Sequence, residues 1–529
     1  MLVFASFACE SVEAEYWWVF LKDKGPTGIE LEKKLEARKL EISPRALERR
    51  RRAGKLPLVD LADVEVHRPY LAQIAKCGVE IRTVSRWLNA VGVRADEKQL
   101  NCLKRLSFVK ELLPLSRAER QEESPGRPRQ YDFNYGEARA QLELIGIDKL
   151  HACGLNGKGV VVGVLDTGFS LAHRALSGTK VVGQYDFINQ DEQTADEPED
   201  PPGQQDHGTK VLSLIAGRDE GFFYGASPDA EFLLAKVIVT DTPDEADSDR
   251  WVAGLEWLEE KGADIVTSSI GFCANCPVER LDGKTEPTTK AARLAVERGL
   301  IVLNSAGNRG PEPMTINAPA DADGVIAVGS VDLERRVAVD SSRGPTYDGR
   351  IKPDIMAPGV EVVMVDPAGE GYIRRSGTSF ATPLAAGAVA LLKQAFPELT
   401  PTEMLRLITS TASRADNPTS DYGWGLLQAA QAAGLFCSCH DQDGDGHYDS
   451  SCGGDDCDDQ RGDVFPGAQE ICDSVDNDCD GSSDEAPSVC LVQGCGCSSH
   501  GRPLTSALWI CFWIMAMEKM FWFSGRKVK

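Results

Sequence analysis

The stretch Ser376-Gly377-Thr378-Ser379-Phe380-Ala381-Thr382-Pro383 decides the fold, and a small, apolar run from Leu384 to Phe396 follows it at once. Gly377 permits a tight turn, Ser379 is suited to start a helix, and the Ala- and Leu-rich run supplies that helix. Pro383 fits a helix only in its first turn, where we place it. The backbone N–H of Ser379 then joins the free donors of a helix N-terminus, which can face an oxygen that becomes negative during acyl transfer. We expect Ser379 to be a nucleophile, although such a pattern taken alone more often marks a simple helix cap.

Two further motifs stand where strands end and helices begin. The apolar run Val160 to Leu165 reads as a strand buried on both faces of a parallel sheet, and it ends in Asp166-Thr167-Gly168. His207, in Asp206-His207-Gly208-Thr209, precedes another small and apolar run, so we place it near the start of a helix. Open α/β sheets keep their sites at the carboxyl ends of the strands. The chain order Asp, His, Ser is one of the known solutions for activating a serine with an imidazole and an orienting carboxylate.

A fourth motif completes the set. Asn308, in Asn304-Ser305-Ala306-Gly307-Asn308, follows an apolar run, and its side-chain amide can donate to an oxyanion. Together these motifs make residues 135–434 resemble the subtilisin-like serine peptidases, the subtilases. The resemblance implies that Asp166 orients the imidazole, that His207 acts as general base and acid, and that Ser379 is the nucleophile. It also implies that Asn308 and the Ser379 N–H form the oxyanion hole, and that catalysis needs no cofactor.

The architecture expected for this region is a doubly wound parallel sheet of the subtilisin-like α/β class, because apolar strand runs alternate with helical patterns. The resemblance implies peptide or protein substrates that pair as an added strand with a groove. The residues assigned to that groove are Ser268, Ser269, Ile270, Gly271, Ala306 and Gly307. The pair Cys273 and Cys276 is expected to form a small loop disulfide rather than a zinc site.

Residues 16–116 read as an α+β prodomain. Strands are expected at 16–21, 79–93 and 108–113, and helices at 44–53, 68–76 and 97–106. The segment resembles the prodomains of secreted bacterial subtilases, which implies a folding template and an intramolecular inhibitor. The run Arg49 to Arg52 is expected to be a solvated helix face. Residues 117–135, rich in Arg, Glu, Pro and Gly, form a linker in which the prodomain is removed.

The segment 437–489 is a different, acidic and cysteine-rich module. It carries a net charge of −15 out of −24 for the whole chain, and it resembles a metal-binding repeat of bacterial surface proteins. Asp441, Asp443, Asp445 and Asp449 have the alternating spacing of a calcium loop. Cys452 stands where such a loop carries its bidentate glutamate, so a further ligand must come from Asp455, Asp456 or Asp458. Calcium is favoured over zinc because the ligands are hard oxygens, with a disordered acidic spacer as the alternative.

Composition points to a location outside the cytoplasm. Nine of the sixteen cysteines lie between Cys437 and Cys497, as expected of a disulfide-stapled extracellular or cell-surface protein. The acidity argues against nucleic acid as a partner. Residues 1–15 read as a truncated signal segment. Residues 490–529 combine a cysteine motif, an apolar stretch and a basic end, and they resemble a C-terminal sorting or membrane-anchor signal.

Two functions follow from these patterns. The first is a secreted or surface-anchored serine-type endopeptidase, made as a self-processed precursor. The alternative is a catalytically idle surface scaffold that binds calcium and partner proteins. All four residues expected to act in catalysis are present, which favours the endopeptidase.

Overall fold

The computed structural model describes residues 15–434 except 117, 119–123, 126–134, 241–246 and 274–275, and beyond them 443, 445, 447, 456–458, 460–471, 473 and 475–483. The chain divides into two compact units, residues 1–440 and 441–529, which we describe separately. The expected signal segment, apart from Glu15, and the C-terminal segment 490–529 lie outside the described residues. Within the described part, none of the helices has the length and apolar character needed to cross a bilayer.

Residues 15–116, the N-terminal domain, form a four-stranded antiparallel sheet in the order β2-β3-β1-β4 with helices beside it. Its elements are β1 (Glu15–Leu21), α1 (Gly28–Glu41), α2 (Pro44–Arg52), η1 (Leu61–Asp63), α3 (Arg68–Ala75), β2 (Glu80–Ser85), β3 (Ala90–Ala95), α4 (Glu97–Leu103) and β4 (Val109–Pro114). The strands and three of the helices confirm the sequence prediction. Helix α1 was not predicted, because charged residues dominate it and leave no clear apolar stripe.

Residues 135–434, the central domain, are built on a seven-stranded parallel sheet in the order β14-β13-β12-β11-β6-β10-β7. Its strands are β6 (Val161–Asp166), β7 (Lys180–Asp186), β10 (Glu231–Lys236), β11 (Ile265–Ser268), β12 (Ile301–Ser305), β13 (Ile326–Val331) and β14 (Ile355–Pro358). Both faces of the inner strand β6 are buried. Val162 and Val164 enter one hydrophobic core, whereas Val161 and Leu165 enter another. This confirms the predicted doubly wound sheet.

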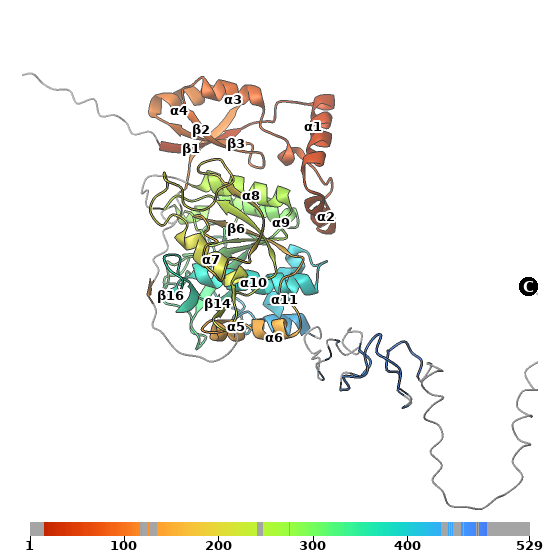
Figure 1. Ribbon diagram of the computed structural model, residues 1–529. Helices are drawn as coiled ribbons and strands as arrows, with labels where there is room; N and C mark the ends of the chain where they lie inside the picture. The colour runs from red at the N-terminus through yellow and green to blue at the C-terminus, as the bar shows by residue number, and fades with distance from the viewer. Residues whose placement is uncertain are drawn as a thin grey trace, which may run out of the picture. The chain divides into compact units, whose positions relative to one another are not determined.

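Helices cover the two faces of this sheet. On one face, α7 (Asp206–Ala216) packs against α10 (Thr378–Ala395), which crosses β11 to β14. On the other face lie α8 (Ser248–Lys261) and α9 (Pro287–Glu297), and the N-terminal sheet lies over them (Figure 1). Trp18 of β1 and Trp251 of α8 share one buried cluster, so the two domains have a common hydrophobic core.

Shorter elements complete the described part of the first unit. They are β5 (Ser124–Pro125), α5 (Arg139–Leu144), α6 (Ile147–Ala152), β8 (Arg218–Asp219), β9 (Phe223–Tyr224), η2 (Val278–Arg280), β15 (Val362–Val365), β16 (Tyr372–Ser376), α11 (Pro401–Ser410) and α12 (Ala429–Ala433). Strands β15, β16 and β5 form a small antiparallel sheet that leads directly into α10.

Candidate active site

Asp166 and His207 meet at the carboxyl edge of the central sheet. Asp166 is the last residue of β6 and is fully buried, and His207 is the second residue of α7. The His207 Nδ1 lies 2.6 Å from Asp166 Oδ1, which also accepts a hydrogen bond from the Thr167 N–H at 2.8 Å. This contact fixes the ring, and it makes Nε2 the imidazole nitrogen available for proton transfer.

Ser379 lies at the start of α10, where the sequence places it, but not as the helix cap. The cap is Gly377, whose φ of 149° lies in a region that L side chains rarely adopt, and Ser379 is the second helical residue. The Phe380 ring centroid is 6.1 Å from that of His207, so the starts of α10 and α7 are adjacent. The Ser379 N–H therefore belongs to the first turn of the helix, where the backbone donors have no helical acceptor.

Pro383 was wrongly placed in the first turn, because it is the sixth residue of α10. A proline there cannot donate to the carbonyl four residues earlier, which is that of Ser379. The structure supplies another donor, since Ser269 Oγ donates to Ser379 O at 2.7 Å. In turn, Ser379 Oγ donates to Ser269 O at 3.3 Å. Because the proline removes the helical donor, the Ser379 carbonyl accepts the Ser269 hydroxyl instead, and this hydrogen bond ties Ser379 to the loop after β11.

Asn308 follows β12 by three residues and lies beside Gly377. Its Oδ1 accepts hydrogen bonds from the Thr378 N–H at 2.9 Å and from Thr378 Oγ1 at 2.7 Å. These bonds identify the other side-chain atom as the amide nitrogen, and Nδ2 is 3.2 Å from the place where a Cβ on Gly377 would stand. The amide donor is therefore held next to the turn that presents Ser379.

The residues assigned to the substrate groove occupy two neighbouring loops. Ser268 ends β11, and its Oγ accepts a hydrogen bond from Trp251 Nε1 at 2.9 Å. The Ile270 carbonyl accepts one from Asn304 Nδ2 at 3.0 Å. The groove residues Ser268, Ser269, Ile270, Gly271 and Ala306 are buried. Gly307, with φ of 109°, packs against Ser342 Oγ. The expected Cys273–Cys276 disulfide is present directly after this loop.

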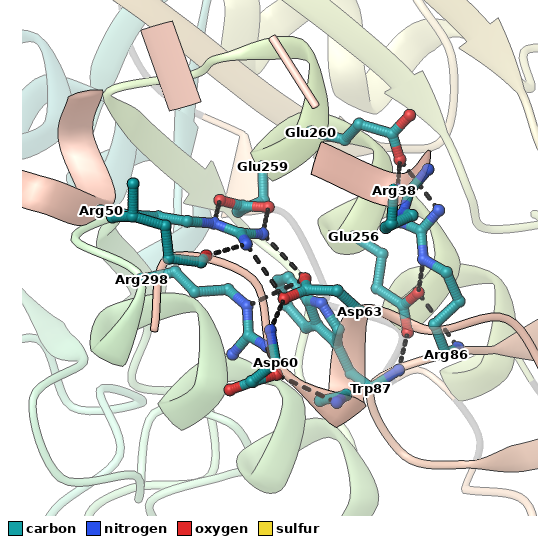
Figure 2. Close-up of polar contacts among 12 residues, drawn as sticks. Arg38, Arg50, Asp60, Asp63, Arg86, Trp87, Glu256, Glu259, Glu260 and Arg298 are labelled. Atoms are coloured by element: carbon teal, nitrogen blue, oxygen red, sulfur yellow. Dashed lines mark hydrogen bonds and ion pairs between the residues drawn. The ribbon is translucent and has the colours of Figure 1, made fainter. Parts of the chain in front are cut away.

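A buried network of charges joins the N-terminal domain to α8 (Figure 2). Arg50 Nη2 lies 2.7 Å from Glu259 Oε2 and 2.9 Å from Asp63 Oδ1, and Arg49 Nη2 lies 2.6 Å from Glu259 Oε1. Arg50 and Glu259 expose only 1% and 2% of their side chains. The prediction of a solvated arginine face was therefore wrong for Arg49 and Arg50. Their shared partner Glu259 lies more than 200 positions away in sequence, where local patterns give no indication of it.

A second carboxylate of α8, that of Glu256, binds the end of β2 and the residues that follow it. Glu256 Oε1 accepts hydrogen bonds from Ser85 Oγ at 2.6 Å and from the Trp87 N–H at 3.1 Å, and Oε2 accepts one from the Arg86 N–H at 3.2 Å. Burial raises the pKa of Glu256. Burial acts in the same direction on Glu259, but attraction to Arg49 and Arg50 outweighs it and holds the pKa of Glu259 below its ordinary value. The N-terminal domain is thus docked on α8 by two carboxylates in different electrostatic environments.

The second unit brings acidic side chains together in two places. Carboxylate oxygens of Asp443, Asp445 and Asp456 lie within 4.8 Å of one another, and those of Glu470, Asp476 and Asp478 form a similar group. Asp443 and Asp445 are two of the predicted ligands, and Asp456 is one of the three further candidates. The remaining two predicted calcium-loop ligands, Asp441 and Asp449, lie outside the described residues. A disulfide joins Cys457 to Cys479 within this module. All-oxygen donor sets of this kind suit Ca²⁺.

Three family models match the chain. The model described as "Subtilase family" matches residues 157–425, and "Peptidase S8 propeptide domain, Bacteroidota" matches residues 16–127. The model described as "Putative metal-binding motif" matches residues 456–485. The three matches follow the chain in the order prodomain, peptidase domain and metal-binding module.

Curated relatives agree with these matches. Serine protease AprX of Bacillus subtilis is 32% identical over 52% of this chain and 66% of its own length. Subtilisin DY of Bacillus licheniformis is 32% identical over 55% of this chain and 97% of its own length. Subtilisin-like protease PopC of Myxococcus xanthus is 31% identical over 58% of this chain and 66% of its own length.

A solved structure shows the same fold. The crystal structure of fervidolysin from Fervidobacterium pennivorans, a keratinolytic enzyme related to subtilisin, superposes with a TM-score of 0.57 at 21% identity, covering 82% of this chain and 62% of that one. The protein belongs to the subtilase family of serine peptidases and carries a Bacteroidota-type propeptide in front of its peptidase domain.

Proposed function

We propose that the protein is a precursor serine endopeptidase that hydrolyses peptide bonds with the residues Asp166, His207 and Ser379. The observation that carries the proposal is the 2.6 Å contact between Asp166 Oδ1 and His207 Nδ1, at the sheet edge where α10 presents Ser379. Fixing Nδ1 in this way leaves Nε2 to take the serine proton. Family membership supports this assignment of roles.

The chemistry runs through an acyl-enzyme. Ser379 Oγ attacks the substrate carbonyl as its proton passes to His207 Nε2, while Asn308 Nδ2 and the Ser379 N–H stabilise the oxyanion. His207 then protonates the departing amine, and a water molecule, deprotonated by the same imidazole, hydrolyses the ester. Asp166 stays ionised and stabilises the imidazolium. These side chains supply every proton transfer, so no cofactor enters the proposed cycle.

The prodomain acts as an intramolecular inhibitor and folding template until it is cut away. Its match to a peptidase propeptide and its docking on Glu256 and Glu259 of α8 support this role. Because the chain carries a peptidase propeptide and a disulfide-linked acidic module, we place the mature enzyme outside the cell or at its surface.

The C-terminal module holds a structural divalent cation, for which Ca²⁺ has the best match of donors. Asp443, Asp445 and Asp456 would hold one ion, and Glu470, Asp476 and Asp478 provide a second group of oxygens. The bound ion would stabilise a short and strongly charged segment by neutralising its carboxylates. Peptide hydrolysis does not pass through this module.

The test is expression of the intact precursor beside its Ser379→Ala variant, followed by measurement of intact masses. The proposal predicts that the wild-type chain loses its prodomain by a cut within the linker and that the variant retains it. A wild-type chain that stays whole, or a variant that is cut as readily as the wild type, would contradict the proposal. The first of these results would favour the idle surface scaffold.

A further inference from the structure

Three neighbouring strands of the central sheet end in charged residues that stand in register. The parallel pairing sets Asp166 of β6 beside Lys236 of β10, and Lys236 beside Asp186 of β7. Side chains in register on neighbouring strands point to the same face of a sheet. Lys236 therefore shares a face with Asp166, the residue that binds His207, and the two aspartates and the lysine are all buried. A lysine with no exposed surface requires a specific partner.

Two carboxylates hold the Lys236 ammonium. Its Nζ lies 2.8 Å from Asp186 Oδ2 and 2.6 Å from Asp200 Oδ2. Burial acts to lower the pKa of Lys236, but these two contacts outweigh burial and raise the pKa above its ordinary value, so the side chain stays charged. One carboxylate oxygen from each of Asp186, Asp191 and Glu197 lies within 4.8 Å of the others. Lys236 is thus a fixed cation among carboxylates that would otherwise repel one another.

Asp200 belongs to the loop of residues 187–205, which joins β7 to the helix that carries His207. Four residues after Asp200, the buried side chain of Gln204 donates a hydrogen bond to the carbonyl of Thr167, in the turn directly after β6. Gln204 is in turn three residues before His207. The ion pair at Asp200 and this hydrogen bond therefore close the loop onto the sheet immediately before the catalytic imidazole.

Hydrogen bonds within the loop make this closure rigid. The Gln205 N–H donates to Asp196 Oδ1 at 2.7 Å, and the Asp196 N–H donates to Gln205 Oε1 at 3.0 Å. Asp200 Oδ2, which contacts the lysine, also accepts a hydrogen bond from the Glu197 N–H at 2.8 Å. Since these bonds connect the ion pair to the residue that precedes α7, a displacement of Asp200 is passed on to the start of that helix.

We propose that Lys236 is a positioning residue for catalysis. By bridging two carboxylates, its ammonium sets the start of α7 and with it the position of the His207 imidazole relative to Ser379. The inference rests on the proposed peptidase function and adds to it a residue that acts through the loop and takes no part in proton transfer. Without the ammonium, Asp186 and Asp200 repel each other, and the loop moves away from the sheet. The substrate groove, on the loops after β11 and β12, keeps its shape.

The experiment measures kcat and KM of the mature enzyme on a peptide anilide, with the active enzyme counted by fluorophosphonate titration carried to completion. Lys236→Met keeps a long side chain and removes its charge. The kcat should fall about 100-fold, the loss expected when a catalytic group is displaced by a short distance. KM should equal that of the wild type, because it reports binding when the chemical step is slow and the groove is unchanged.

Lys352→Met is the matched control. Lys352 is also buried, its Nζ lies 2.6 Å from Asp354 Oδ2, and it donates to the Val325 carbonyl at 2.6 Å. This pair stands at the amino edge of the sheet, where β13 and β14 begin, opposite to the edge that carries the site. Lys352→Met should therefore lower the melting temperature, as Lys236→Met does, and leave kcat unchanged. The comparison separates positioning of the imidazole from general stability.

Asp200→Asn tests the same bridge from the loop, and it decides the question if Lys236→Met does not fold. It should lower kcat and leave KM unchanged, because the loop loses its charged contact while the strands stay intact. In the double variant with Lys236→Met, kcat should fall by less than the product of the two single losses, since both changes break one contact.

The outcomes separate the two claims. A loss of kcat in Lys352→Met as large as in Lys236→Met, an Asp200→Asn variant with the wild-type kcat, or single losses that multiply in the double variant would each overturn the inference. So would a rise in KM with kcat unchanged, and all of these results leave the peptidase function standing. Absence of Ser379-dependent hydrolysis by the wild-type enzyme would overturn the proposed function, and the inference with it.

Discussion

The buried carboxylate of Glu259 gives a sharp test of how the prodomain is held. In the complex, Glu259 pairs with Arg49 and Arg50, and all three side chains are almost completely buried. Once the prodomain leaves, both guanidinium partners leave with it. Glu259→Ala should therefore weaken the complex and leave the mature peptidase almost unchanged.

The size of the loss in binding free energy follows from the cost of leaving a buried charge without its partner. Removing one partner of a buried ion pair costs about 3–5 kcal/mol, and each 1.4 kcal/mol is about a factor of ten in an equilibrium constant. Asp63 still faces Arg50, and the Ala263 carbonyl still accepts from Arg49, so the lower half of this range is the better expectation. The dissociation constant of the cleaved prodomain should rise about 100-fold or more.

The assay dilutes the processed, noncovalent complex of prodomain and peptidase and measures how far peptide hydrolysis remains inhibited at each concentration. Glu297→Ala, an exposed glutamate of α9, is the control and should leave the dissociation constant unchanged. In a double-mutant cycle, Arg50→Ala should cost much less in the Glu259→Ala background than in the wild type. A weakening no larger than that of the control, or an equal loss of activity in the mature enzyme, would refute the docking role of Glu259.

Three further predictions concern pH, the serine loop and the metal module. Burial acts to raise the pKa of Glu259, but attraction to Arg49 and Arg50 holds it below its ordinary value in the complex. Because these two arginines leave with the prodomain, the contribution of Glu259 to affinity is present at neutral pH and is lost as the pH falls through the lowered pKa of the bound state. The ratio of dissociation constants for Glu259→Gln and wild type should accordingly approach one in acid, and a ratio independent of pH would contradict this. Ser269→Ala leaves the Ser379 carbonyl without its side-chain donor. The free energy of unfolding should therefore fall by about 1–3 kcal/mol, and kcat should fall with it. The matched Ser268→Ala variant breaks the contact with Trp251 instead, so it separates a general loss of packing from loss of the Ser269–Ser379 bond. Chelation of divalent cations should abolish the thermal transition of the C-terminal module and spare peptide hydrolysis, and calcium should restore the transition; a module that melts at the same temperature with and without chelator would exclude a structural ion there.

The main fold was predictable because its signals are local. Unbroken apolar runs such as Val161 to Leu165 mark strands buried on both faces, and the polar motif after each run marks the carboxyl edge of the sheet. Asp166, His207 and Ser379 each lie at the boundary of an element, and Asn308 lies in the loop directly after β12, as their motifs indicated. Their assembly at one edge follows from the parallel topology.

The prodomain contacts were not predictable in the same way. Arg49 and Arg50 look like a solvated face because they belong to a run of four arginines in a short helix, and a local pattern gives no sign that two of the four are buried against another domain. Their partner Glu259 is supplied by a helix of another domain. The position of Pro383 was misjudged for a related reason, because the compensating hydroxyl of Ser269 comes from a distant loop. Long-range pairing of polar groups leaves no periodic trace in the sequence.

The most direct test of the peptidase claim is covalent labelling of the mature enzyme with a fluorophosphonate, followed by peptide mapping. The account predicts one modified residue, Ser379, and a labelling rate that falls by several orders of magnitude in His207→Ala, because the serine then lacks its base. Labelling of a different serine, or labelling of Ser379 at the same rate without His207, would contradict it.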